Sequence, residues 1–172
     1  MDGRRQWPWA GLLATALLIV GMTLAPFTNA AAQGKACGLA TPEELRAALG
    51  APVSGLRAQS VPGGTADLCA GQTPTASVML RLAKRSGQQG VEAAGIDVAK
   101  KMGAQVQVET VGPITCSSMI PPKSLEQYGF NTTCSVLKNG QVAAIEVTVK
   151  SQKDMVTMES LRKVAEKMAG RF

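Results

Sequence analysis

The sequence contains no histidine and few aromatic residues. Its 172 residues include two tryptophans, one tyrosine and three phenylalanines. Without histidine, neither a Ser-His-Asp triad nor a Cys-His pair can form, which excludes acyl-transfer hydrolysis by these routes. Zinc sites built from cysteine lose their commonest partner, and few rings remain to stack on bases or sugars. We therefore expect no metal and no cofactor, and nucleic acid is disfavoured as a partner.

The N-terminal segment has the pattern of an export signal. Arg4 and Arg5 precede an apolar run over residues 10–25, and the alanines at 30–32 provide small residues for an A-x-A cleavage site. The run is shorter than the roughly 20 residues that a membrane span requires. We expect residues 1–32 to be a signal peptide cleaved after Ala32, with cleavage after Ala30 as the alternative.

Residues 33–172 are expected to form a single domain that is soluble after cleavage. Removing 32 residues leaves 140, which is enough for one core, and these carry 16 basic and 11 acidic residues, a net charge of +5. Lys35 stands where a lipoprotein signal needs a small residue before Cys37. A bacterial periplasmic or secreted protein is therefore favoured over a lipid-anchored one, with at most peripheral membrane contact.

The four cysteines predict two disulfides, because exported proteins of this size commonly use cysteine as a staple. Four cysteines allow three pairings, of which we favour Cys37 with Cys69 and Cys116 with Cys134. The second bond would pin a long loop to a hairpin. No C-x-x-C motif points to a redox site.

Residues 130–150 have the pattern of a β-hairpin. Asn139-Gly140 is a preferred dipeptide of a two-residue type I′ turn, in which both residues adopt positive φ. Such a turn fixes the register of the two strands. The expected facing pairs are Phe130 with Val149, Thr132 with Val147, Cys134 with Ile145 and Val136 with Ala143.

The remaining elements follow from caps and periodicity. Thr41, Pro42 and Glu44 form a capping box that begins a helix, and Gly50 ends it. Residues 89–102 and 154–169 have helical spacing of apolar residues, whereas 53–61, 75–85 and 104–111 read as strands, with a further strand beginning at Cys69. Residues 117–129 show no period and contain Pro121-Pro122, which predicts a loop.

These elements predict an α+β fold, a largely antiparallel sheet with helices packed on one side, in the order α-β-β-β-α-β-β-β-α. The spacing from Cys69 to Ser86 equals that from Cys134 to Ser151, which suggests a duplicated αβββ unit over 37–86 and 87–151, followed by the C-terminal helix. Chance matching of short apolar patterns is the alternative.

The expected loop is the first candidate for a binding site, because long loops on a rigid scaffold often carry function. Its apolar and amphipathic residues are Met119, Ile120, Pro121, Pro122, Leu125 and Tyr128. Alternatively, these residues fold back over the sheet and complete the core.

Three basic pairs are the second candidate, as a surface for a polyanion such as a wall polymer or a membrane surface. They are Lys84-Arg85, Lys100-Lys101 and Arg162-Lys163. Ser160 and Lys163 also match the S-x-x-K pattern of serine-lysine enzymes, but the companion motifs are absent, so a solvated helix surface is the better interpretation.

The run Cys37-Gly38-Leu39, the capping box from Thr41 to Glu44, the helix end Leu49-Gly50 and the second cysteine Cys69 resemble small bacterial envelope domains of unknown function. Such domains are exported and are frequent among actinobacterial lipoproteins. The resemblance covers chiefly the first half of the chain, and the chain departs from it by lacking a lipobox. It implies an exported α+β module without known catalysis and transfers no functional residue.

Together these patterns predict a non-enzymatic envelope module that binds an envelope protein or another envelope component. A polyanion-binding surface protein is the alternative, and an enzyme with a carboxylate or Ser-Lys site is the third. The sequence does not indicate the ligand or the oligomeric state.

Overall fold

The computed structural model describes residues 34–60, 66–85 and 88–172, and for residues 88–94 it describes the backbone only. The expected signal peptide and both expected cleavage sites lie outside the described residues. Within the described part of the chain, no helix is long and apolar enough to cross a membrane.

Seven antiparallel strands form one sheet in the order β1-β2-β3-β7-β6-β5-β4, which confirms the predicted α+β class. The strands are β1 (Ser54–Gln59), β2 (Ala66–Gln72), β3 (Ala76–Lys84), β4 (Gln105–Val111), β5 (Ile114–Ile120), β6 (Phe130–Lys138) and β7 (Gln141–Val149). The α-helices are α1 (Pro42–Leu49), α2 (Gln88–Lys101) and α3 (Met158–Met168). Short 3-10 helices lie at η1 (Lys35–Gly38), η2 (Lys123–Tyr128) and η3 (Gln152–Asp154).

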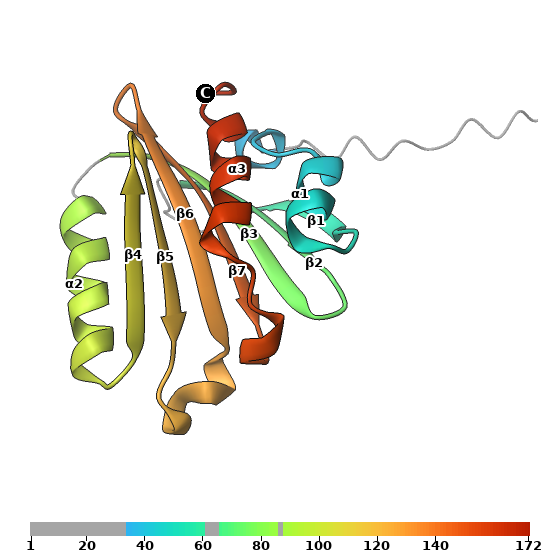
Figure 1. Ribbon diagram of the computed structural model, residues 1–172. Coiled ribbons are helices and arrows are strands. Elements are labelled where there is room, and N and C mark those ends of the chain that lie inside the picture. The colour runs from blue at the N-terminus through green and yellow to red at the C-terminus, as the bar shows by residue number, and fades with distance from the viewer. Residues whose placement is uncertain (1–33, 61–65, 86–87) are drawn as a thin grey trace, which may run out of the picture.

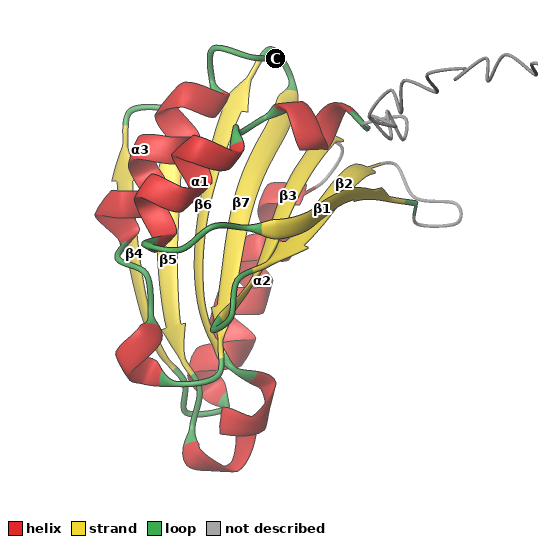
Figure 2. Ribbon diagram, turned by 90° about the vertical axis from the view of Figure 1, so that its right-hand side faces the viewer, coloured by secondary structure: helices red, strands yellow, loops and turns green. Residues whose placement is uncertain are grey.

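The two faces of the sheet differ in their cover (Figures 1 and 2). Helix α3 packs against β5, β6 and β7, α1 packs against α3, and η1 contacts β1, β2 and β3. We call this the covered face. It holds the core, in which Leu80, Ile145 and Leu161 are fully buried. Helix α2 lies beside β4 in Figure 1, and Figure 2 shows it across the sheet from α1 and α3, on what we call the open face.

The position of α2 departs from the expected packing of all helices on one side. The alternation of β4 explains it. Val106 lines a hollow with α2 on the open face, whereas Glu109 points to the covered face, where Arg162 of α3 contacts it at 2.6 Å. Val106 and Val108, the apolar residues in the middle of β4, therefore face the side on which α2 lies.

The hairpin of β6 and β7 has the predicted register. All four expected pairs are present, including Cys134 with Ile145 and Phe130 with Val149. Asn139 and Gly140 have φ of 50° and 71°, as a type I′ turn requires. The local turn chemistry thus fixes the centre of the sheet.

Strands β3 and β7 join the two halves of the sheet in a nine-residue antiparallel ladder. Leu80 faces Ile145 at its middle, and on the outer sides Cys69 faces Leu80 and Cys134 faces Ile145. Cys69 and Cys134 are 65 residues apart, as are Leu80 and Ile145. The hairpins β2–β3 and β6–β7 are therefore related by an approximate two-fold axis through the Leu80–Ile145 pair, with the offset that the sequence suggested. The helices do not follow this symmetry, since α2 lies on the opposite face from α1.

The prediction of a loop over residues 117–129 is wrong for its first part. Residues Ile114–Ile120 form β5, so that the second half of the chain has four strands and the order is α-β-β-β-α-β-β-β-β-α. Ile114 and Cys116 are buried at alternate positions, and Ser118 and Ile120 continue the same face. The serines at 117 and 118 hide this period-two pattern in the sequence.

The last helix begins later than expected. Residues Gln152–Asp154 form η3, and α3 starts at Met158 rather than at 154. Thr157 caps it, because its hydroxyl oxygen accepts a hydrogen bond from the backbone N–H of Ser160 at 3.2 Å. Helix α1 begins with the predicted capping box, in which Glu44 accepts a bond from the N–H of Thr41 at 2.9 Å.

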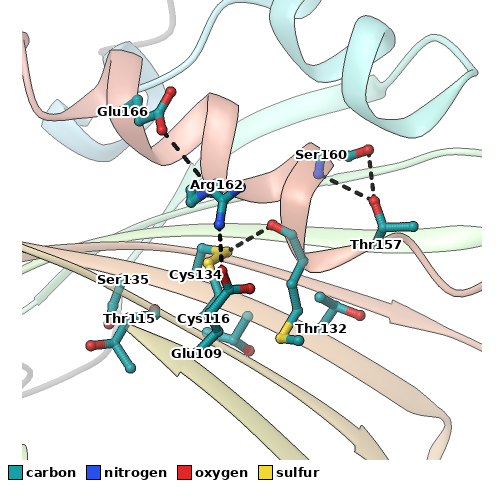
Figure 3. The surroundings of a disulfide bond; sticks show 12 residues. Glu109, Thr115, Cys116, Thr132, Cys134, Ser135, Thr157, Ser160, Arg162 and Glu166 are labelled. Atoms are coloured by element: carbon teal, nitrogen blue, oxygen red, sulfur yellow. Dashed lines mark hydrogen bonds and ion pairs between the residues drawn. A yellow bond between two sulfur atoms is a disulfide. The ribbon is translucent and has the colours of Figure 1, made fainter. Parts of the chain in front are cut away.

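Both disulfides have the pairing that we favoured. The bond between Cys37 and Cys69 ties η1 to β2, and that between Cys116 and Cys134 joins β5 to β6. The second bond links adjacent strands rather than pinning a loop. Figure 3 shows the contact between Arg162 of α3 and Glu109 beside this second disulfide. In the chain-entropy account each bond contributes about 3 to 4 kcal/mol.

A partly buried ion pair clamps the C-terminus to the first helix. Arg171 donates two hydrogen bonds to the carboxylate of Glu44, at 2.6 and 2.7 Å, and a third to the carbonyl of Leu39 at 2.7 Å. The Glu44 side chain is only 13% exposed. The hydrogen bonds from Arg171 outweigh the desolvation of the carboxylate and lower the pKa of Glu44 to about 2.

We expect this clamp to make the free energy of unfolding depend on pH in the acidic range. The folded pKa of Glu44 lies below its ordinary value of 4.5, so the contribution is complete above that value and is lost as the pH falls towards 2. Glu44→Gln keeps the capping box, since glutamine serves at that position, but removes the charge. It should lower the free energy of unfolding by about 1 to 2 kcal/mol near neutral pH, because Arg171 is partly solvated.

The measurement is denaturant unfolding near neutral pH and near pH 3. The loss caused by Glu44→Gln should shrink in acid. Glu43→Gln, at the exposed neighbouring position, is the control and should change little. An equal loss for Glu44→Gln at both pH values would contradict this account of the clamp.

Candidate functional site

The open face is the part of the sheet most suited to a ligand. Because β-strand side chains alternate, the residues between the core positions all point to this face. Helix α2 lies over part of it, and the described residues line three hollows there. We name them the inner hollow of about 440 Å³, the apolar hollow of about 390 Å³ and the outer hollow of about 450 Å³.

The inner hollow lies between α2 and the strands β3 to β7. Ile96 and Ala99 of α2 form one wall, with Val106 of β4 and Met119 of β5. Its floor is rich in hydroxyl groups, which come from Thr115, Ser117, Thr133 and Ser135. This hollow therefore combines apolar walls with a hydrogen-bonding floor.

The apolar hollow continues the inner one towards η2. Val98 of α2 and Met102, which follows the end of that helix, line it together with Leu125 and Tyr128 of η2. The side chains of Val98 and Met102 are 54% and 56% exposed, and that of Tyr128 is 73% exposed. Unpaired apolar groups at this density are typical of a surface that another molecule covers.

The structure gathers most of the residues expected in a binding loop. The apolar hollow is lined by Met119, Pro121, Pro122, Leu125 and Tyr128. Met119 and Ile120 belong to β5 rather than to a loop, and Ile120 points the other way, packing partly buried against the core. The alternative, that these residues complete the core, describes Ile120, and Pro121 is also buried although it lines the hollow.

Among the described residues, Glu146 of β7 is the one whose side chain lines all three hollows. Its carboxylate accepts a hydrogen bond from the amide of Asn131 at 2.8 Å. The same amide donates to the hydroxyl of Thr148 at 3.2 Å, and the Asn131 carbonyl accepts a bond from Thr133 at 2.7 Å. This network holds the half-buried carboxylate in place.

The charges near Glu146 leave it without an ionic partner in the described residues. Arg81 lines the inner hollow and is itself engaged in an interaction, whereas Arg57 lines the outer hollow on β1. No ion pair joins Glu146 to either of them. A cationic group of a ligand could therefore reach an anchored carboxylate at the meeting point of the three hollows.

The basic pairs do not converge on one surface. Lys84 and Arg85 precede α2 and Lys100 and Lys101 lie at its end, which for a 14-residue helix separates them by about 20 Å. The pair on α3 is on the covered face, where Arg162 contacts Glu109 at 2.6 Å and Lys163 contacts Glu159 at 3.0 Å.

Ser160 and Lys163 likewise serve the helix surface. The hydroxyl of Ser160 accepts a bond from Thr157 at 2.9 Å, and Lys163 is held by Glu159. Neither group contacts the other in the described hydrogen bonds. Among the described residues, no three cysteines, aspartates or glutamates lie close enough together to hold a metal ion.

Sequence reasoning did not identify Glu146 or Asn131 as site residues. The signal was present in the alternation of the hairpin strands, since Asn131, Thr133 and Ser135 occupy every second position of β6 and Glu146 and Thr148 do so in β7. A polar face opposite a core face is usually only solvated. Its importance here depends on α2, whose place over that face the sequence did not predict.

The network around Glu146 predicts a selective loss of stability. Asn131→Leu keeps the volume but leaves Glu146, Thr148 and Thr133 without their shared partner. It should lower the free energy of unfolding by about 1 kcal/mol, because water can partly replace the lost bonds. Ser117→Ala removes a hydroxyl of the same floor that has no hydrogen-bond partner in the described residues, and it should be nearly neutral. Urea unfolding of both variants is the measurement, and equal losses would contradict the network.

Comparison of the chain with protein-family models, with curated proteins and with solved structures found no match.

Proposed function

We propose that this chain is an exported, non-enzymatic binding module that holds an extended segment of a partner protein on its open face. The observation that carries the proposal is the position of Glu146, an anchored carboxylate shared by a hydroxyl-lined hollow and an apolar one. The segment would place a bulky apolar side chain in the apolar hollow and a lysine or arginine at Glu146.

The apolar hollow supports an anchor of this kind. Val98 on α2, Met102 just after it and Leu125 on η2 offer adaptable side chains, and binding would remove their exposed surface from water. Burial of apolar surface contributes roughly 25 cal/mol per Å², and a few anchors usually dominate the affinity of an interface.

The floor of the inner hollow favours a polypeptide ligand over a purely apolar ligand. Hydroxyls and the Asn131 amide can donate to and accept from the main chain of a bound segment. An acyl chain would cover these groups without bonding them, which costs free energy. Sugars are disfavoured because Tyr128 is the only aromatic residue among those that line the three hollows.

Glu146 supports a basic residue beside the anchor. A carboxylate held by Asn131 is already oriented, so a cation that contacts it loses less conformational freedom in forming the pair. The two disulfides fit a protein that works in an oxidising compartment, such as the periplasm or the medium.

The polyanion alternative has less support. Its cations lie at both ends of α2 and on α3, and two of them are neutralised in ion pairs with Glu109 and Glu159. An enzyme would need a second reactive group close to Glu146, and the described side chains next to it in the hollows are hydroxyls, amides and apolar groups, with the engaged Arg81.

Selection of random peptides displayed on phage against the immobilised, oxidised protein tests the proposal. The enriched peptides should combine a bulky apolar residue with a nearby lysine or arginine. Binding of a labelled synthetic copy is then measured by fluorescence anisotropy. Glu146→Gln should weaken it about tenfold, which corresponds to about 1.4 kcal/mol.

The control is a double-mutant cycle. Replacing the basic residue of the peptide by methionine should abolish the effect of Glu146→Gln, because the two charges act as a pair. Glu43→Gln, on the exposed surface of α1, should not change binding. The proposal is wrong if no peptide is enriched, or if the enriched peptides bind Glu146→Gln as well as the unchanged protein.

A further inference from the structure

The two edges of the sheet differ in their protection. At one edge, β1 has an irregular register between Ser54 and Arg57, Gly55 adopts a φ of 65°, and η1 packs against the strand. Bulges and covering segments are the devices by which proteins prevent an edge strand from pairing with another chain. The β1 edge is therefore closed to a further strand.

Among the described residues, the other edge strand, β4, has neither a register shift nor a glycine of positive φ within it, and α2 contacts it from the open face. Its sequence QVQVETV contains no lysine, proline or glycine, and it pairs with β5 without a break over seven residues. Its one charge, Glu109, is neutralised by Arg162. A regular edge strand of this length, whose one charge is paired, is a template for another strand.

The hydrogen-bonding direction of β4 follows from the second disulfide. Cys116 and Cys134 face each other with their Cα atoms 4.0 Å apart, which identifies a pair that is not hydrogen-bonded. The backbone N–H and C=O of Cys116 therefore point to β4, where they meet Glu109. Since these groups alternate along a strand, those of Val106, Val108 and Thr110 point outward to the free edge.

Exposed apolar side chains of β4 lie at the same edge. The large hydrophobic side chains that are exposed in the described residues include Val108 and Val111, at 48% and 46%. Val108 points to the open face and Val111 to the covered face, so the edge carries an exposed apolar side chain on each face of the sheet. Exposure of this kind marks an interaction surface.

We infer that β4 pairs antiparallel with β4 of a second copy, about a two-fold axis at Val108, so that the two sheets form one continuous sheet. The register is self-complementary. Val108 faces Val108 of the second copy, Val106 faces Thr110, and Gln107 faces Glu109, so no like charges are opposed. The backbone N–H and C=O groups of Val106, Val108 and Thr110 in one strand then form hydrogen bonds with those of the same three residues in the other strand.

The closure of the assembly favours a second copy over an unrelated strand. An isologous pair consumes both β4 edges and leaves only the two protected β1 edges, so that assembly stops at the dimer. The axis is perpendicular to the sheet, so both α2 helices lie on the same face, flanking the junction. The proposed dimer does not depend on the partner segment proposed for the hollows of the open face.

Sedimentation velocity of the exported, oxidised protein over a range of concentrations tests the inference. The unchanged protein should be dimeric. Val108→Lys and Val108→Asp each oppose like charges at the axis, and each should raise the dimer dissociation constant about tenfold or more. Gln59→Lys, which adds a charge at the β1 edge, is the control and should leave the dimer intact.

Mixing the two charged variants separates loss of the interface from loss of the fold. Val108→Lys mixed with Val108→Asp should restore dimers, because opposite charges then meet at the axis. A monomeric unchanged protein, a dimer that withstands both substitutions, or a mixture that stays monomeric would each overturn the inference.

Discussion

The ladder between β3 and β7 is the contact on which the rest of the structure depends. It joins a three-stranded meander to a four-stranded one, and Leu80 and Ile145 at its centre are fully buried. Each of these residues also faces a disulfide-bonded cysteine on its outer side, Cys69 or Cys134. The two staples thus flank the seam symmetrically. Sequence spacing, strand register and covalent bonds all specify the same alignment.

That alignment also separates the core from the candidate site. With Leu80 and Ile145 directed to α1 and α3, their neighbours Met79, Ala144 and Glu146 must face the other way. A slip of one residue would bury Glu146 and expose the core, so the register is strongly specified. The disulfides and the Glu44–Arg171 clamp hold the covered face, whereas α2 covers part of the open one. The scaffold is rigid on one side and accessible on the other.

Local signals in the sequence predicted a large part of this architecture. The Asn139-Gly140 turn gave the hairpin register, Thr41 and Glu44 gave the start of α1, and spacing favoured the disulfide pairing that the structure has. Features that depend on tertiary packing were not predicted from the sequence. Strand β5 was hidden by its serines, and α2 lies on the open face because of the alternation of β4. Glu146 and Asn131 become a site only when two strands and a distant helix meet.

The central claim is that the open face, beneath α2, holds a partner segment. Photo-cross-linking in the exporting cell tests it most directly, with p-benzoyl-phenylalanine replacing Met102 in the apolar hollow or, as the control, Arg46 on the exposed side of α1. The account predicts that position 102 forms a cross-link to one partner polypeptide, that position 46 does not, and that Glu146→Gln reduces the product. Cross-linking from position 46 but not from position 102, or a product unaffected by Glu146→Gln, would contradict it.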